Sequence, residues 1–325
     1  MSLPVVEAGS MNLYSIYGGC LQSDVPFPAL PAGDGHPTWR LHRAQGSAPP
    51  VALVQLGEDR VDPGVSVRLF RHARGLRLAY DDTGVFDVYD GGARIDWYPG
   101  TEARVEAMQL DVLGRVLPAA LHETGSLCLH GSAVEIDGTC VAFVAPKHHG
   151  KSTLARAVAG AGGRVLSDDV VAVDFAPTPI VRPGVASVRL WRDAAARFDD
   201  VSCARPDAYG KFVVGDAAGA ALAPPRGPLD AVYVLTPVTD GANEAAARTL
   251  LDPLRATMAL LPHNRLAPLL GGAEAAVTLD RVARLLRHTP VYTLGVVRDF
   301  DRLEEAVRIV WAWHESPARP ARRTA

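Results

Sequence analysis

The sequence predicts an α/β protein, and its composition and the order of its predicted elements support that class. Short strand-like segments fill the first hundred residues, and strands are mixed with helices from about residue 124 onward. Hydrophobic residues make up 48% of the 325-residue chain and charged residues 21%, a balance that supplies a large core and excludes a disordered polymer. We expect a smaller β-rich region with a linking helix over 1–120, a second domain over 121–315 and a frayed tail over 316–325.

The N-terminal region is predicted to consist mainly of short strands. Apolar or alternating segments separated by turn residues carry this pattern over 51–56, 66–72, 76–80, 85–89 and 94–98. Asp90-Gly91-Gly92 predicts a hairpin between the last two, and the Pro- and Gly-rich segment 26–37 is expected to be a loop. Apolar residues at helical spacing over 102–121 predict a helix that links the two halves.

The second half begins with a predicted hairpin and helix. Strands over 127–134 and 141–144 flank the turn Asp137-Gly138, and an alanine-rich helix over 151–161 ends at Gly162-Gly163. Further strands are expected at 165–166, 170–173, 186–191, 211–214, 230–235 and 291–295, and further helices at 192–198, 244–262, 275–287 and 301–314.

Charge and cysteine usage exclude several classes of protein. The net charge of −3 provides no global field for nucleic acid or an anionic membrane, so anion binding requires a local site. The cysteines lie far apart and are expected to be reduced thiols: Cys20, Cys128, Cys140 and Cys203. No signal peptide and no apolar run of membrane-spanning length is found, which predicts a cytoplasmic protein.

A phosphate-binding loop is predicted between the strand 141–144 and the following helix. It comprises Ala145, Pro146, Lys147, His148, His149, Gly150, Lys151, Ser152 and Thr153. In such a loop, backbone N–H groups and a helix N-terminus face the phosphates. The lysine neutralises the β and γ phosphates, and the hydroxyl of Ser152 holds Mg²⁺. The sequence therefore predicts nucleoside triphosphate binding.

The tip of this loop departs from the usual pattern. Ala145 occupies the first position, where glycine is usual, and two histidines follow at the tip. Side chains there restrict the backbone angles available to the loop. His148 and His149 either contact phosphate or base, or are solvated side chains whose backbone alone binds, and we favour the second alternative.

An acidic pair follows the loop at a short interval. Asp168 and Asp169 come 17 residues after Lys151, which fits one helix of about three turns and a tight turn back to the loop. One carboxylate would bind Mg²⁺, with Asp168 a candidate alongside Ser152, and the other would take the proton of an attacking hydroxyl. The alternative is a surface turn, because Ser-Asp-Asp is common turn chemistry. His130, on the strand before the hairpin, is either structural or a partner of this pair.

These segments together resemble the catalytic domain of the HPr kinase/phosphorylase family. The matching segments are Leu129-His130-Gly131-Ser132-Ala133-Val134, the Asp137-Gly138 hairpin, Gly150-Lys151-Ser152-Thr153 and Ser167-Asp168-Asp169-Val170. The resemblance covers about residues 124–300 and is dense over 127–175. Within the family, the sequence most resembles the HPr-kinase-like proteins found with peptide natural-product pathways, including lasso-peptide tailoring kinases. The segment 14–18 and the strands up to 98 resemble the region that precedes the kinase domain in those relatives.

The resemblance implies a fold related to phosphoenolpyruvate carboxykinase, with ATP and Mg²⁺ as cofactors and a serine hydroxyl as phosphoryl acceptor. It places His130 in the active site with Lys151, and it implies that one of Asp168 and Asp169 serves the metal and the other the proton transfer. ATP rather than GTP rests on the resemblance alone. Members of the family often assemble, so the resemblance is compatible with a homo-oligomer.

Two departures from the family bear on the substrate. The loop tip is bulky, and the Ile-Arg-Gly-rich segment expected after the acidic pair is replaced by Val188-Arg189-Leu190-Trp191. These differences argue against HPr as the acceptor and against the reverse, phosphate-removing reaction. Arg189 and Lys211 are candidate phosphate or substrate contacts, with an exposed strand charge as the alternative for each.

Three functions are therefore predicted, in order of preference. The first is a kinase for a serine-like hydroxyl of a peptide natural-product precursor. The second is a kinase for a small metabolite, which a closed pocket beside Asp168 and Asp169 would favour. The third is a nucleotide-binding regulator without catalysis, against which the acidic pair argues. No G-x-G-x-x-G dehydrogenase motif and no H-E-x-x-H metal motif is present.

Overall fold

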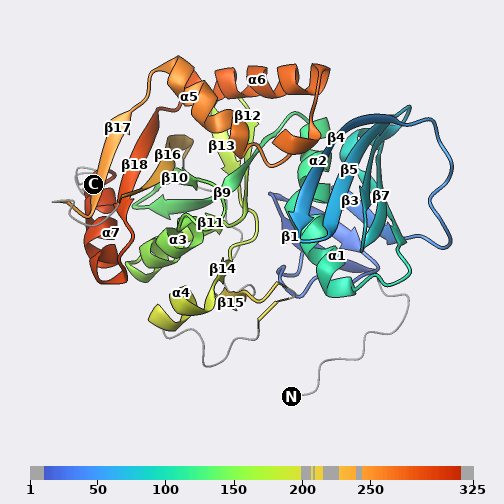
Figure 1. The fold of residues 1–325 in the computed structure, drawn as a ribbon, viewed down its shortest axis with the longest axis horizontal. Helices are drawn as coiled ribbons and strands as arrows, with labels where there is room; N and C mark the ends of the chain where they lie inside the picture. The colour runs from blue at the N-terminus through green and yellow to red at the C-terminus, as the bar shows by residue number, and fades with distance from the viewer. Residues whose placement is uncertain (1–10, 199–205, 208, 215–226, 239–243, 316–325) are drawn as a thin grey trace, which may run out of the picture.

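The computed structural model of the chain describes residues 11–198, 206–207, 209–214, 227–238 and 244–315. The predicted tail over 316–325 and the predicted free thiol of Cys203 lie outside these residues. Within them the protein is a mixed α/β structure with two large sheets and a two-stranded hairpin. The two sheets lie side by side in Figure 1, with the N-terminal sheet in blue and cyan.

The N-terminal sheet has eight strands in the order β1-β2-β3-β8-β7-β6-β5-β4. Their bounds are β1 (Asn12–Ile16), β2 (Gly19–Ser23), β3 (Trp39–Arg43), β4 (Val54–Asp62), β5 (Val65–His72), β6 (Gly75–Tyr80), β7 (Gly84–Tyr89) and β8 (Arg94–Pro99). β3 pairs in parallel with both β2 and β8, and the strands from β8 to β4 form an antiparallel meander. The short turn at Asp90–Gly92 joins β7 to β8, as the glycine pair predicts.

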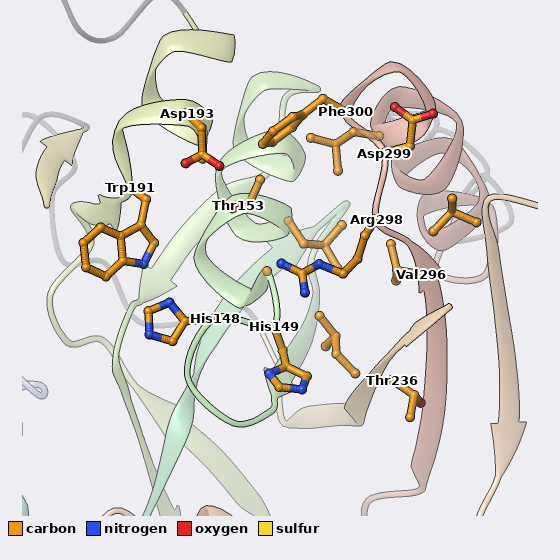
Figure 2. Close-up of a pocket in the computed structure, with 16 residues that line it drawn as sticks. His148, His149, Thr153, Trp191, Asp193, Thr236, Val296, Arg298, Asp299 and Phe300 are labelled. Atoms are coloured by element: carbon orange, nitrogen blue, oxygen red, sulfur yellow. The ribbon is translucent and has the colours of Figure 1, made fainter. Parts of the chain in front are cut away.

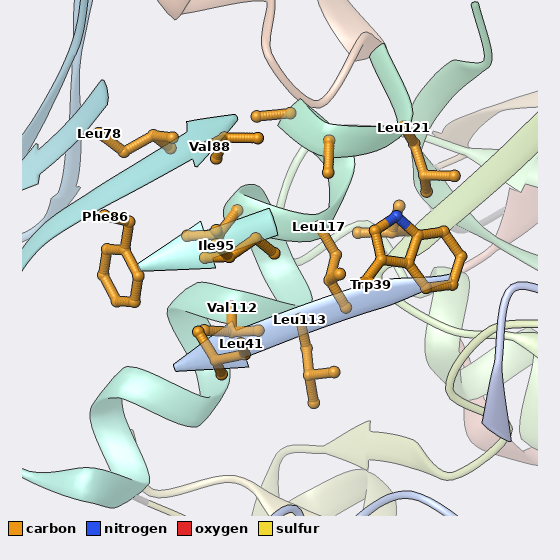
Figure 3. Packing of buried hydrophobic residues seen from close by; sticks show 14 of the residues in the cluster. Trp39, Leu41, Leu78, Phe86, Val88, Ile95, Val112, Leu113, Leu117 and Leu121 are labelled. Carbon is orange, nitrogen blue, oxygen red and sulfur yellow. The ribbon is translucent and has the colours of Figure 1, made fainter. Parts of the chain in front are cut away.

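One helical segment covers this sheet. It consists of α1 (Val105–Asp111), a single π-helical turn η2 (Val112–Val116) and α2 (Leu117–Glu123). Alternate residues of the strands, such as Phe86 and Val88, pack against its apolar face (Figure 3). Cys128, Val170 and Ala172 from the second sheet belong to the same core, so this segment packs against both sheets.

The second sheet has the order β13-β12-β9-β10-β16-β18-β17, with β11 also paired to β9. The bounds are β9 (Leu127–Ile136), β10 (Thr139–Val144), β11 (Arg164–Ser167), β12 (Val170–Phe175), β13 (Pro179–Arg182), β16 (Leu229–Val238), β17 (Ala246–Leu250) and β18 (Val291–Val297). β10, β16 and β18 run in parallel, so their carboxyl ends meet at one edge. A separate hairpin pairs β14 (Val188–Leu190) with β15 (Phe212–Val214).

Helices cover both faces of this second sheet. α3 (Lys151–Gly160) and α7 (Leu303–Ala312) pack on one face, with α4 (Arg192–Arg197) beyond them. α5 (Pro253–Leu260) and α6 (Ala273–Leu286) pack on the other face, as Figure 1 shows. The result is a three-layer arrangement whose parallel centre leads into the loop at Ala145–Gly150.

The structure differs from the sequence prediction at several elements. The helix expected over 244–262 is wrong in its first part, because residues 246–250 form edge strand β17 against β18. The helix starts only at Pro253, where the Asp252 side chain accepts a hydrogen bond from the Arg255 backbone at 2.9 Å. β1, β2, β3 and β13 were not predicted, and the strand expected over 51–56 runs instead over Val54–Asp62.

Candidate functional site

The loop between β10 and α3 has the geometry of an anion-binding turn. Gly150 adopts a left-handed conformation with φ of 85°, and α3 begins directly afterwards at Lys151. No side chain caps this helix, so the N–H groups of its first turn are left to a ligand. The loop also stands at the carboxyl edge of the parallel strands, where open α/β sheets commonly bind ligands.

Lys151 lies folded across the base of the loop. Its ammonium group donates hydrogen bonds to the carbonyl oxygens of Ala145 at 2.9 Å and Pro146 at 3.0 Å. Burial lowers the pKa of Lys151 to about 8, although the nearby carboxylates of Asp169 and Asp168 oppose this change. The side chain is thus held inside the loop by weak neutral partners that a phosphate would replace.

The two histidines of the loop tip are arranged differently. His148 takes a left-handed conformation with φ of 67°, and its ring stacks on Trp191 with centroids 5.3 Å apart. The ammonium group of Lys211 lies 5.3 Å from the centre of the same indole ring. His149 instead contacts the Lys147 carbonyl through Nδ1 at 2.9 Å. The ring of His148 is exposed, and that of His149 is partly buried.

Asp168 is buried beside the start of α3. Its Oδ1 accepts hydrogen bonds from the hydroxyls of Ser132 at 2.6 Å and Ser152 at 2.9 Å. Its Oδ2 accepts one from the backbone N–H of Arg189 at 3.1 Å. The sequence therefore brings a hydroxyl of the loop and a carboxylate of the acidic pair into direct contact, as the 17-residue interval predicts.

Asp169 lies between two nitrogen groups. Nδ1 of His130 is 3.2 Å from its Oδ1, and Nη2 of Arg265 is 3.0 Å from its Oδ2. Burial alone would raise the pKa of Asp169, but Arg265 and His130 outweigh it and hold that pKa well below the usual value. Asp169 is therefore ionised at neutral pH. Burial lowers the pKa of His130, which favours a neutral ring whose Nδ1–H faces Asp169.

Arg265 was not predicted from the sequence, and its position depends on the π-helical turn. Pro118 has no backbone N–H to donate to the carbonyl of Gly114, four residues earlier in the helix. That carbonyl accepts a hydrogen bond from Nε of Arg265 at 2.6 Å instead. The Arg265 backbone is fixed by its own hydrogen bond to the Cys128 carbonyl at 2.8 Å. The N-terminal half thus orients the cation that faces Asp169.

Two cavities meet at the loop. One has a volume of about 660 Å³ and lies between the loop tip and the β18–α7 connection. Figure 2 shows His148, His149 and Trp191 at one end of it and Arg298, Asp299 and Phe300 at the other. Much of its remaining lining is apolar, including Leu235, Val296, Val297 and Leu303.

The second cavity, of about 510 Å³, contains the charged groups. It is lined by Lys151, Ser152, Asp168, Asp169 and His130, and also by Arg265 and Arg189. Val61, Asp62 and the segment 110–115 close it from the N-terminal half. His148, Gly150, Thr153 and Trp191 line both cavities, so the loop separates them.

All the lysines of the chain lie in this second cavity. The sequence contains three lysines, Lys147, Lys151 and Lys211, and every other basic side chain apart from histidine is an arginine. Each of the three lines the cavity, and burial lowers the pKa of each. None forms an ion pair with a carboxylate of the described residues. Arg189, by contrast, is paired with Asp207, with 2.6 Å between Nη2 and the carboxylate oxygen.

The residues present fit a magnesium ion. Ser152 and Asp168 bring a hydroxyl and a carboxylate oxygen within 2.9 Å of each other at the start of α3. No group of three or more histidine, cysteine or acidic side chains with the geometry of a metal site occurs within the described part of the chain. Mg²⁺ requires few protein ligands, because phosphates and water complete its shell.

Comparison with solved structures finds distant likenesses. No protein-family model and no curated protein matches the sequence. The structure is similar to that of the HPr(Ser) kinase/phosphatase from Coxiella burnetii, with 13% sequence identity and a TM-score of 0.26. The matched region covers 57% of this chain and 95% of that protein. Among the described helices, none is both long and apolar enough to cross a membrane.

Proposed function

We propose that this protein is an ATP- and Mg²⁺-dependent kinase that transfers the γ-phosphoryl group to a serine-like hydroxyl. The observation that carries this proposal is the position of the three lysines in one cavity, unpaired with any described carboxylate, at the start of α3. Three compact cations without a counter-ion suit a polyphosphate anion. The three arginines of the same cavity are each paired with a carboxylate: Arg115 with Asp59, Arg189 with Asp207 and Arg265 with Asp169.

The two cavities give each part of the nucleotide a place. The base and ribose would occupy the cavity of about 660 Å³, whose apolar lining and Trp191 and Phe300 rings suit a flat base. The phosphates would cross the loop at Gly150 into the lysine-lined cavity. Ser152 and Asp168 would hold Mg²⁺, which supplies charge neutralisation at the β and γ phosphates.

The hydrogen bonds support different roles for the two members of the acidic pair. Asp168 contacts the Ser152 hydroxyl and therefore suits the metal. Asp169, fixed by His130 and Arg265, would accept the proton of the attacking hydroxyl through a remaining lone pair. The hydroxyl oxygen then bonds to the γ-phosphorus, and the bond to the β-phosphate oxygen breaks as ADP leaves. Lys151 would stabilise the charge on the transferred group.

The acceptor class rests on the sequence resemblance, which favours a serine of a peptide natural-product precursor. A small hydroxyl metabolite is the second candidate. The observation in its favour is the cavity beside Asp169, which is closed on one side by Val61 and the segment 110–115. Transfer to a serine peptide or to a metabolite under the same conditions separates the two.

Calorimetric titration of Mg-ATP into wild type and Lys151→Ala tests the proposed function. We expect wild type to bind and the variant to bind about 10- to 100-fold more weakly, because a charged hydrogen-bond donor to phosphate is lost. Arg192→Ala, at an exposed position on α4 outside both cavities, is the matched control and should bind like wild type. Equal affinity of Lys151→Ala and wild type would overturn the phosphate-loop assignment.

A further inference from the structure

The part of the charged cavity that the N-terminal half lines carries acidic groups that the proposed phosphate site does not use. Asp62 at the end of β4 and Asp111 at the end of α1 line it, both from the N-terminal half. Tyr209, between β14 and β15, lines the same cavity. None of these three is part of the phosphate loop or of the acidic pair.

Asp111 is a buried carboxylate with no cation of its own. It is 5% exposed, and its Oδ2 accepts a hydrogen bond from the Thr83 hydroxyl at 2.6 Å. No basic side chain of the described residues lies within ion-pair distance of it, since the nearby Arg115 is paired with Asp59. Burial raises the pKa of Asp111 to about 7, and the neighbouring Asp82 adds to this effect against the opposing Thr83, Arg115 and Arg265. A cation from outside the chain would relieve this energetic cost.

Tyr209 lines the same cavity as these acidic groups. Burial raises the pKa of its phenol to about 12, with further contributions from the charges of Asp111, Asp82 and Asp62. Its ring belongs to the same cavity lining as both carboxylates, although its hairpin belongs to the second half of the chain. Cζ of Arg189 lies 5.9 Å from the centre of this ring, and Arg189 is itself paired with Asp207. An aromatic ring beside carboxylates that lack a basic partner is the chemistry that recognises an ammonium group.

The N-terminal half contributes Asp62, Asp111 and Arg115 to the charged lining of the cavity, and Arg115 is already paired with Asp59. Lys147 and Lys151 lie on the loop side, whereas Asp62 and Asp111 come from the N-terminal half. In-line transfer requires the acceptor to approach the γ-phosphorus from the side away from ADP, next to Asp169. The remainder of the acceptor molecule would then lie near Asp62 and Asp111.

We propose that the phosphoryl acceptor carries a cationic amino group close to its hydroxyl, and that Asp111 and Asp62, with the ring of Tyr209, bind this group. The inference rests on the proposed kinase function and names the chemical class of its acceptor. A serine unit with a free α-amino group or with a neighbouring lysine satisfies it, and an acceptor whose only charges are negative does not.

The test uses a pool of short peptides with one central serine and randomised neighbours. One half of the pool is kept with free amines, and the other half is acetylated selectively on every amine. Full-length protein is incubated with each half and with Mg-ATP labelled in the γ position, and label in peptide serine is counted. Mg-ATP affinity is measured separately by calorimetry for every protein used. We expect wild type to label the free-amine pool at least tenfold faster than the acetylated pool.

The variants identify the residues responsible for that preference. Asp111→Asn retains an oxygen for Thr83 and should lose most of the tenfold preference, and the exposed Asp62→Asn should lose part of it without risk to folding. Glu58→Gln, an exposed acid of β4 outside both cavities, should behave like wild type.

Three results would overturn the inference. Equal labelling of both pools would do so, as would a preference unchanged in both aspartate variants. A third is the absence of labelling in either pool while Mg-ATP still binds, which would exclude this acceptor class and leave nucleotide binding in place. Failure of wild type to bind Mg-ATP would remove the proposed kinase function, and the inference with it.

Discussion

Asp169 is held by contacts from distant parts of the chain. His130 approaches it from β9, and Arg265 comes from a segment 96 residues further along the sequence. Both contacts favour the ionised carboxylate and lower its pKa, although burial works in the opposite direction. A carboxylate held in this way is a weak base, so we expect it to contribute mainly by orienting the acceptor hydroxyl and receiving its proton late in the transfer.

The change Asp169→Asn tests this role. We expect it to lower the transfer rate by about 10²- to 10⁴-fold, the usual contribution of a positioned acid–base group. Its affinity for Mg-ATP should stay close to that of wild type, because the phosphates contact the loop. Single-turnover transfer to an accepted hydroxyl and calorimetry measure the two quantities. Full transfer activity would exclude Asp169 as the proton acceptor, and nucleotide binding without transfer in wild type would favour a non-catalytic regulator.

Asp168 provides the contrast within the pair. Asp168→Asn should weaken the Mg²⁺ dependence of nucleotide binding, because its contact is with the Ser152 hydroxyl. The affinities for ATP measured with and without Mg²⁺ should therefore differ in wild type and be similar in the variant. A variant with the same Mg²⁺ dependence as wild type would remove Asp168 from the metal site.

Among the elements, the π-helical turn joins the two halves of the protein at the site. The missing N–H of Pro118 leaves the Gly114 carbonyl to Arg265, and Arg265 holds Asp169. Gly114 also has little room for a side chain, since a Cβ atom there would lie 3.0 Å from Nη2 of Arg265 and 3.6 Å from Oδ2 of Asp169. The shape of the linking helix at Gly114 therefore determines where Arg265 lies, and through Arg265 it orients the Asp169 carboxylate.

Gly114→Ala tests this connection. The added methyl group should displace the Arg265 guanidinium and lower the transfer rate about tenfold, whereas the free energy of unfolding should change by no more than about 1 kcal/mol. Gly160→Ala, at the end of α3, where the nearest atom to an added Cβ is 3.4 Å away on the Arg156 side chain, is the control. Rates and urea unfolding measured for both proteins decide the question, and an unchanged rate in Gly114→Ala would contradict the proposed role of the turn.

For the molecule as a whole, a buried ionic network joins the N-terminal sheet to the helices of the second half. Arg71 of β5 pairs with Glu123 of α2 at 2.9 Å and also with Glu274 of α6. His122 lies 3.1 Å from Glu274 through Nε2 and accepts a hydrogen bond from Arg281 at Nδ1, 2.7 Å away. These contacts require an ionised Glu274 and a neutral His122 with its proton on Nε2.

The network predicts loss of stability in acid. Burial and Arg281 lower the pKa of His122 below its ordinary value of 6.5. The contribution of His122 to the free energy of unfolding therefore declines as the pH falls below about 6.5. Burial alone would raise the pKa of Glu274, but His122 and Arg71 outweigh it and lower that pKa. The contribution of Glu274 to the free energy of unfolding is therefore present above about pH 4.5 and is lost below that pH. Both groups bind more protons when the chain is unfolded, and both effects therefore have the same sign.

Urea unfolding between pH 7 and pH 4 measures this dependence. We expect the midpoint to fall with pH in wild type, and Glu274→Gln to be less stable at pH 7 and to change less between pH 5 and pH 4. Glu102→Gln, which alters an exposed acid outside the network, should follow wild type. If the urea midpoint of Glu274→Gln changed with pH in the same way as that of wild type, Glu274 would not couple stability to pH.

The sequence by itself determined the parts of the site that are contiguous. A strand, a loop with Gly150 and Lys151, a helix and the acidic pair lie within 30 residues, so spacing predicts that the pair can return to the mouth of the loop. The structure has Asp168 in contact with Ser152. Local turn chemistry likewise predicts the β7–β8 hairpin. The alanine-rich segment 244–250 was assigned as helix because edge pairing with β18, which makes it a strand, leaves no signal in its composition.

Only the tertiary structure decided which distant groups complete the cavity. Arg265, Asp111 and Tyr209 carry no motif, and each reaches the site through the path of the chain between two sheets. The position of all three lysines in one cavity also depends on the tertiary structure. Lys211 lies 60 residues beyond Lys151, between β14 and β15, whereas Lys151 begins α3. Periodicity and spacing describe neighbours along a strand or helix, whereas burial of charge depends on what the complete fold places around it.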